Sequence, residues 1–372
     1  SLPKAKEFWQ YKLKGFIAPT PLTVDTLPLL REQSNQEQLV SFSEQQIQLT
    51  VQATEKAKSF VRQHQLTINN LVQAAWALLL SRYSGQTEVV FGATVSGRPP
   101  SLVGIESMVG LFINTLPVLV KVSAETELLP WLKNLQAQQV ECEQYSYSPL
   151  VEIQGVSEIP KGTSLFDSIV VFENYPLDAA AEQYDCGLSI SNIQTTEQTN
   201  YPLAVVAVLD EQLSVKITYD TSKFDSATVT RMLGHFQTLF EGIVANSVGS
   251  IEQLPMLTEV ERQQLLIDWN STAAEYPQDK CIYQLIEAQV EQTPDAIAVV
   301  FENQQLTYRE LNNRANQLAN YLQTLGVGPE MFVGLCMEPS LETTVGLLGI
   351  LKAGGVYVPL DPQLPKQRLA FM

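Results

Sequence analysis

The sequence predicts an α/β protein in two parts: a mixed-sheet α/β sandwich over residues 1–250 and the start of a second α/β unit over residues 282–372. Helical and strand patterns are interleaved in both parts, which is typical of α/β architecture. In the first part, the strand patterns 203–209 and 213–220 flank Asp-Glu-Gln, a hairpin signal that makes the sheet mixed. Residues 251–281 are polar and lack a sustained pattern, so we assign them to an interdomain linker.

The elements of the first part follow from periodicity and from end signals. Apolar residues at helical spacing predict a helix over 67–83, with Thr67 as its N-cap and Gly85 closing it. The second hairpin strand alternates apolar and polar residues, which predicts one buried and one solvated face. The other elements expected, in order, are helices over 5–15 and 51–64, strands over 88–95 and 111–122, a helix over 127–145, a strand over 166–174 and a helix over 225–245.

The second part has a more regular alternation. Helix and strand patterns follow one another as in a parallel βαβ arrangement. We expect a helix over 282–292, a strand over 296–301, a turn at 303–305, a helix over 307–325, a strand over 331–337, a helix over 340–353 and a strand over 355–359. The chain begins at Ser1 and ends at Met372, directly after a strand and a helix start. We interpret it as a piece of a longer protein.

Composition and charge exclude several functions. The 372 residues include 40 acidic and 23 basic side chains, a net charge of −17 without a Lys/Arg cluster, so we expect no nucleic-acid partner. No apolar run reaches the roughly 18 residues that span a bilayer and no signal peptide is evident, which predicts a cytoplasmic protein without membrane contact. The cysteines lie more than 40 residues apart, so we expect reduced, mostly buried thiols and no zinc site: Cys142, Cys186, Cys281 and Cys336.

Neither histidine belongs to a catalytic motif. His64 falls where two helices join, so a solvated or capping role is expected, and His235 is expected at the surface or half-buried on the amphipathic helix 225–245. A Ser/His or Cys/His nucleophilic pair would need one of them. The phosphate-binding patterns GxxxxGK[ST] and GxGxxG are also absent from the sequence. No complete catalytic set can be derived from the chain.

The apolar strand pattern VGLFINTLPV, residues 109–118, contains a feature that core packing does not explain. Asn114 and Thr115 stand in its middle, and each needs a hydrogen-bond partner or costs about 1–3 kcal/mol when buried. Pro117, which cannot donate a ladder hydrogen bond, predicts an edge strand or a bulge. Two further stretches are unusually polar at their ends: SGRP at 96–99 and FDSIVVFENYP at 166–176.

Together these three stretches resemble the carboxyl-terminal half of a condensation domain from a nonribosomal peptide synthetase. VGLFINT at 109–115 fully matches the family's (I/V)GxF(V/I)NT strand, with the SGRP loop upstream and the FDSxVVFENYP strand downstream. The strand motif favours amide-forming condensation domains, of the type accepting an L-configured donor, over epimerising and heterocyclising relatives. The resemblance covers residues 1 to about 250 and implies a lobe of the chloramphenicol-acetyltransferase-like fold.

The second part resembles the truncated start of an acyl-adenylate-forming, or adenylation, domain. LTYREL at 306–311 and LKAGGVYVPLD at 351–361 match the first two core motifs of that family. The resemblance implies that Lys352, Tyr357 and Asp361 hold the adenylation core together rather than act on a substrate.

The resemblance implies a segment of a synthetase module. The condensation part would help to join a carrier-bound aminoacyl or peptidyl thioester to the amine of the next aminoacyl thioester. Four side chains are expected to line the substrate tunnel as positioning groups: Ser96, Arg98, Asn114 and Ser168. Asn114 would face the tunnel with the other even positions of its strand, while the odd positions pack against helices.

Several parts of such an enzyme are missing from this sequence. It has no HHxxxDG motif, so we assign no catalytic residue, and no phosphate loop follows the second adenylation motif. We therefore expect the isolated chain to be inactive and to bind no cofactor. The full enzyme would use phosphopantetheine on carrier domains, and ATP with Mg for adenylation. The implied partners are carrier-protein domains, the other condensation lobe and the rest of the adenylation domain.

Two alternatives remain open. One is a free-standing acyltransferase that uses coenzyme A, and the missing HHxxxDG histidines argue against it. The other is a non-catalytic module that docks carrier proteins, and the acidity of the chain argues against binding an acidic carrier.

Overall fold

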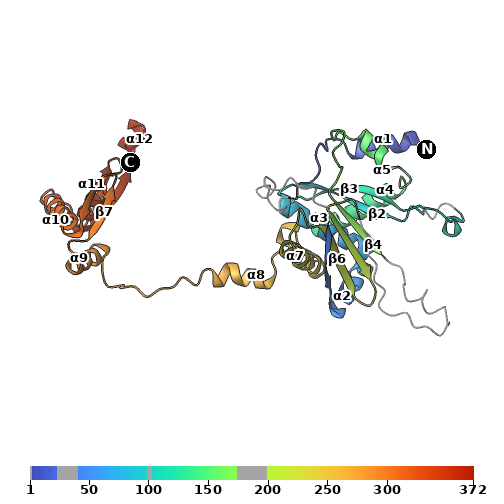
Figure 1. Cartoon of the computed structure of the whole chain (residues 1–372), viewed down its shortest axis with the longest axis horizontal. Helices are drawn as coiled ribbons and strands as arrows, with labels where there is room; N and C mark the ends of the chain where they lie inside the picture. Colours follow the sequence, from blue (N-terminus) through green and yellow to red (C-terminus); the bar gives the residue numbers. More distant parts are fainter. Residues whose placement is uncertain (1, 23–40, 99–102, 174–198) are drawn as a thin grey trace. The chain divides into compact units, whose positions relative to one another are not determined.

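The computed structural model describes residues 2–22, 41–98, 103–173 and 199–372 (Figure 1). It divides into two compact units, Ser1–Ser271 and Thr272–Met372. Three features named above, Pro99, Asn174–Pro176 and Cys186, lie outside the described residues.

The first unit contains a six-stranded mixed sheet, as predicted. Its strand order is β1-β6-β5-β4-β2-β3, in which β4 runs parallel to β2 and to β5 while the other neighbours are antiparallel. The strands are β1 (Phe42–Gln48), β2 (Glu88–Val95), β3 (Asn114–Lys121), β4 (Ser168–Glu173), β5 (Leu203–Leu209) and β6 (Leu213–Asp220). The expected hairpin is β5–β6, and β3 is an edge strand, which fits the presence of Pro117.

Helices cover the sheet through two hydrophobic clusters. Successive residues of β4 belong to different clusters, Ile169 to one and Val170 to the other, because side chains alternate across a strand. The larger cluster joins the sheet to α2 (Val51–His64), α3 (Ile68–Ser84), α4 (Leu128–Glu143) and α7 (Ser226–Ala245) (Figure 1). The smaller one includes residues of α1 (Leu2–Lys12) and α5 (Leu150–Val156). The predicted caps of α3 are confirmed: the Thr67 hydroxyl accepts from Asn70 N, and Gly85 is left-handed.

Three expectations for the first unit differ from the structure. β1 was not predicted, because its sequence FSEQQIQ has few apolar residues; it forms by pairing along its whole length with residues 214–220 of β6. The strand expected from residue 111 begins only at Asn114. The face of β6 expected to be solvated is partly covered, since Thr218 and Asp220 are buried.

The second unit is built from α9 (Ile282–Gln292), β7 (Ile297–Phe301), β8 (Gln304–Thr307), α10 (Tyr308–Thr324), β9 (Phe332–Cys336), α11 (Leu341–Lys352), β10 (Val356–Leu360) and α12 (Lys366–Phe371). β9 and β10 are parallel, as expected. The turn predicted at 303–305 lies at 302–303, because Gln304 and Gln305 already belong to β8, which pairs with β7 in an antiparallel hairpin. The strand β8 was not recognised because it begins with two polar glutamines; its pairing partner is β7, the strand directly before it in the chain.

In the described part of the chain, none of the helices combines the length and the apolar character that crossing a membrane would require.

Candidate functional site

The SGR segment that follows β2 is shaped by one glycine. Gly97 has a φ of +64°, in the left-handed region that favours glycine. A Cβ at this position would also overlap the carbonyl oxygen of Phe112. Gly97 therefore lets the segment after β2 lie directly against the backbone that leads into β3.

Arg98 holds the loop that precedes β3. Its guanidinium donates to the carbonyl oxygen of Ile105 and, over 3.0 Å, to that of Met108. The guanidinium carbon also lies 4.3 Å from the centroid of the Phe112 ring, within cation–π range. Arg98 thus uses N–H donors and one face of its guanidinium in contacts with residues 105–112. Its observed role is to shape this loop.

Asn114, the first residue of β3, uses both N–H groups and the oxygen of its side-chain amide in hydrogen bonds. Its Nδ2 donates to the carbonyl oxygens of Ser146 and Ser148, both over 2.8 Å, and its Oδ1 accepts from Thr115 N over 2.9 Å. These partners explain why an amide stands in an apolar run. Asn114 joins β3 to the segment between α4 and α5, which the hydrogen bonds Tyr145 N to Cys142 O and Ser148 N to Tyr145 O fold into turns.

The face of β3 that carries Asn114 differs from the expectation. The even positions Val118 and Val120 pack in the larger, helix-covered cluster, whereas they were expected to line a tunnel. Among the odd positions, the Thr115 methyl lies over Gly92 on the neighbouring strand. The even positions do not share one side, however, because Leu116 packs in the smaller cluster, where the odd position Leu119 also lies.

The four predicted tunnel residues fall in two places. Val95 pairs with Asn114, so Ser96 and Arg98 follow β2 directly beside the start of β3. Ser96 is exposed, and its Oγ accepts a long bond, 3.4 Å, from Arg98 N. Ser168, on β4, is 2% exposed, and its Oγ accepts from the Trp76 indole Nε1 over 3.1 Å. The structure therefore brings Ser96, Arg98 and Asn114 together and places Ser168 in the core against α3.

The loop fastened by Arg98 and Asn114 presents apolar side chains to solvent. These are Val103, Val109 and Leu111, which are almost fully exposed, and Ile113, which is 59% exposed. Side chains of this kind seldom cluster on the surface of a monomer unless they meet a ligand or another surface. We call residues 103–113 the motif loop.

In the second unit, Lys352 ties three helices together. Its Nζ, in a side chain only 4% exposed, donates to Asn312 Oδ1 over 2.7 Å, to Asn316 Oδ1 over 2.8 Å and to Glu287 Oε1. Three acceptors match the three N–H groups of an ammonium. Of the two other motif residues, Tyr357 is 38% exposed on β10, and Asp361 Oδ1 accepts from Gln363 N over 2.9 Å in a turn.

Family models match both units. The model described as "Condensation domain" covers residues 1–266, well over half of the chain. The chain belongs to the condensation-domain family. A second model, "AMP-binding enzyme", matches residues 286–372. The chain thus carries a condensation region followed by the start of an adenylation domain, the order found in nonribosomal peptide synthetases.

Relatives and solved structures agree with this assignment. Two linear gramicidin synthase proteins from Brevibacillus parabrevis are similar to the chain, one with 48% identity over 371 residues and the other with 47% over 375 residues. The alignments include 100% of this chain but only 5% and 7% of the relatives, so it spans a small fraction of their length. A holo four-domain nonribosomal peptide synthetase bound to AMP and glycine superposes with a TM-score of 0.76 at 18% identity, covering 99% of this chain and 28% of that one. The X-domain from teicoplanin biosynthesis gives 0.57 at 20% identity, over 69% and 57%. At these identities the structures show the fold alone.

Two expectations about reactive side chains of this synthetase segment need correction. His235 was expected at the surface or half-buried, but it is 7% exposed and hydrogen-bonded on both ring nitrogens. The thiols were expected to be mostly buried, but of those described only Cys142 is buried, while Cys281 and Cys336 are exposed. Burial raises the pKa of the Cys142 thiol to about 11, and nearby Lys12 opposes this. No group of three potential metal ligands converges among the residues that the structure describes.

Two residues beside the predicted site residues were not singled out from the sequence. Gly97 and Phe112 lie inside the matched motifs but were not singled out, although a glycine beside an arginine is a turn signal. Asp167, recognised in the sequence at the entrance of the strand that contains Ser168, has a carboxyl pKa raised by burial, against the opposing charge of Lys223. Nothing in the local sequence signals that burial.

Proposed function

We propose that, in the whole synthetase, this condensation region forms one side of the site that joins a carrier-bound aminoacyl or peptidyl thioester to the amine of the next aminoacyl thioester. The second unit would begin the adenylation domain that activates the amino acid. The observation that carries the proposal is the motif loop, whose backbone is fixed by Arg98 and Asn114 while its apolar side chains are exposed.

The contacts suggest a division of labour within this site. Arg98 and Asn114 act as positioning residues, because their donors are used on carbonyl groups of the protein. Ser96 is better placed to meet a substrate: it is exposed, and its hydroxyl accepts one long bond, so its proton can be donated to a substrate carbonyl. Ser168 could reach a substrate only if its bond to Trp76 were exchanged.

The exposed side chains of the motif loop also suggest which partners this region would contact in the whole synthetase. The exposed side chains of the motif loop would be covered by the other condensation lobe and by the substrate arm, since four large apolar groups in water are unfavourable. The substrates would arrive on the phosphopantetheine of carrier domains. The completed adenylation domain would use ATP with Mg. The proposed location is the cytoplasm.

The first test uses the isolated chain of 372 residues. It should form no amide from carrier-bound thioesters, because it has no HHxxxDG motif, and it should catalyse no amino-acid-dependent pyrophosphate exchange, because no phosphate loop follows its second adenylation motif. Robust turnover in either assay would refute the proposal.

The second test uses a complete module that contains this segment. Arg98→Ala should lower amide formation at least tenfold, because the motif loop loses two backbone anchors. The same preparation should keep its pyrophosphate exchange, since the adenylation domain is untouched. Lys4→Ala, on α1, is a control that removes a cation from the same lobe. Equal condensation rates in Arg98→Ala and the parent module would sink the proposed role of the loop.

A further inference from the structure

The segment after α7 stays attached to the condensation lobe well beyond the end of the helix. Ile251 N donates to Thr126 O over 3.0 Å, and Arg82 Nη2, from α3, donates to Ile251 O over 3.1 Å. Ile251 and Leu254 are 2% and 3% exposed. The first residues of the predicted linker are therefore packed as part of the lobe.

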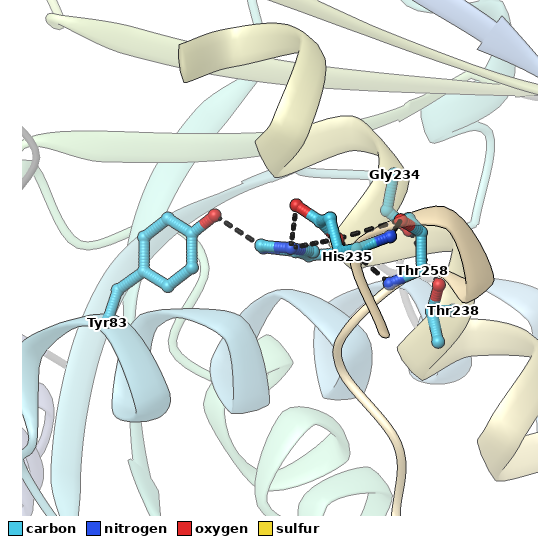
Figure 2. A network of polar contacts seen from close by, with 6 residues as sticks. Tyr83, Gly234, His235, Thr238 and Thr258 are labelled. Carbon is cyan, nitrogen blue, oxygen red and sulfur yellow. Dashed lines mark hydrogen bonds and ion pairs between the residues drawn. The ribbon is translucent and has the colours of Figure 1, made fainter. Parts of the chain in front are cut away.

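The attachment ends in a polar network that joins three helices (Figure 2). The Tyr83 hydroxyl of α3 lies 2.7 Å from His235 Nδ1 on α7. His235 Nε2 lies 3.0 and 2.9 Å from the two carboxylate oxygens of Glu261, on α8 (Glu259–Gln263). We call Tyr83, His235 and Glu261 the latch.

The carboxylate of Glu261 serves two structures at once. Its Oε2 accepts from Thr258 N over 2.9 Å, and together with the bond from Glu261 N to Thr258 Oγ1 this forms the capping box of α8; Oε2 also accepts from Thr258 Oγ1 over 2.8 Å. Burial acts to raise the pKa of Glu261, but the hydrogen bonds from Thr258 and His235 outweigh it and hold the pKa below its ordinary value. The capped end of α8 is thus bonded to α7 through an ionised acceptor.

Both hydrogen bonds of the latch can form whether the imidazole of His235 is neutral or protonated. With Glu261 as the acceptor at Nε2, that nitrogen carries a proton. Nδ1 then accepts from the Tyr83 hydroxyl in the neutral ring or donates to it in the imidazolium. His235 is 7% exposed, so an imidazole that lost either partner would leave a buried polar nitrogen unpaired, at substantial cost.

Beyond Glu261 the chain leaves the lobe. Glu261 is half-buried, whereas every residue from 262 to 282 is exposed. Close to the latch, Thr258 packs tightly against α7 at Gly234, because a Cβ added at this glycine would come within 3.1 Å of the Thr258 methyl. The latch is therefore the final fastening before the exposed stretch that leads to the adenylation unit.

We propose that Tyr83, His235 and Glu261 form a latch that fixes the point at which the linker leaves the condensation lobe, with His235 as its positioning residue. Opening the latch would release α8 and lengthen the free linker back toward Leu254, which is held by apolar burial. The latch would thus set the reach of the linker without contacting a substrate.

Trypsin provides a local readout, because two of its cleavage sites lie on either side of the exit point. Arg262 follows Glu261 directly and lies within α8, while Lys280 lies in the exposed stretch far from the latch. Cleavage of a helical site requires local opening, so its rate follows the open population. In the full chain, His235→Leu should raise the Arg262-to-Lys280 cleavage ratio about tenfold. Glu261→Gln, which can still form the capping box, should raise it by a similar factor.

A double variant separates the latch from general weakening. If His235 and Glu261 act through their contact, the double variant should show the ratio of the stronger single variant, whereas independent effects would multiply. Arg62→Ala, which changes an exposed residue of α2 outside the latch, is the control and should leave the ratio unchanged. If His235→Leu does not fold, the more exposed Glu261→Gln still decides. Ratios within twofold of the parent chain, or effects that multiply, would overturn the proposal.

Discussion

Replacing Asn114 by alanine tests whether its amide is the fastener between β3 and the segment after α4. The substitution removes three hydrogen bonds, two to the carbonyls of Ser146 and Ser148 and one from Thr115 N. Each contributes about 0.5–1.5 kcal/mol net, and carbonyls of buried residues are then left unpaired. Because Asn114 is itself only half-buried, water can rehydrate part of the site. We expect a loss of about 2–4 kcal/mol in the free energy of unfolding.

The tryptophans make this measurement specific to the condensation region. Trp9, Trp76 and Trp131 are buried in the condensation lobe, Trp269 is 64% exposed in the stretch after α8, and the second unit contains no tryptophan. Urea unfolding followed by tryptophan emission therefore reports on this unit even though the chain contains a second one. The midpoint should fall while the slope with urea stays the same.

Two further variants at the same place define the cause. Asn114→Asp has nearly the same shape but turns a carboxylate toward two carbonyl oxygens, so at pH 7 it should destabilise at least as much as alanine. Thr115→Val keeps the backbone N–H that donates to Asn114 and should cost less than about 1 kcal/mol. An Asn114→Ala change below about 0.5 kcal/mol, or an equal loss in Thr115→Val, would refute the fastener argument.

Three further outcomes are expected. Lys352→Met should lower the stability of the second unit by about 1–3 kcal/mol, because three acceptors lose their donor. Hydrogen exchange of α9–α11 measures this loss, and the exposed substitution Lys366→Met is the control. Gly97→Ala should free the motif loop and speed its hydrogen exchange at least tenfold, because a Cβ overlaps the backbone of Phe112; equal exchange would contradict this. Burial raises the pKa of Tyr83 to about 12, so a titration of the parent chain followed at 295 nm should show one phenol that ionises at higher pH than the others, and this step should be missing in Tyr83→Phe. Since folding favours the neutral phenol, its contribution to stability is complete below pH 10 and is lost between pH 10 and 12.

Much of the fold could be predicted because its signals are local. The ends of α3 are fixed by Thr67 and Gly85, and the β5–β6 hairpin is indicated by two strand patterns that flank a short polar turn. What failed depends on distant partners. The strand β1 is recognisable only once β6 lies beside it, since its sequence is mostly polar. The apolar residues 109–113 predicted a strand, yet Gly97 and Arg98 hold them in a loop.

The candidate site shows the same limit. A polar pair in an apolar strand correctly indicated that Asn114 has fixed partners, but those partners are carbonyls 32 and 34 residues later in the chain. His235 was misjudged because its own helix suggests a partly exposed position. Its burial comes from Tyr83, 152 residues earlier, and from Glu261, 26 residues later. Periodicity describes one element, whereas burial depends on all the elements packed against it.

The motif residues also explain why so specific a match can occur in a chain without the catalytic histidines. Arg98 and Asn114 bond to carbonyl groups within the lobe, so the VGLFINT and SGRP stretches define the course of a backbone rather than a reacting group. A segment that requires this backbone conformation requires such residues, whether or not the same segment also carries the catalytic histidines. A match to these stretches is therefore evidence for a condensation lobe with a shaped, apolar rim. Evidence for catalysis must come from residues that face the substrate, and of the predicted set Ser96 is the one whose exposure allows it.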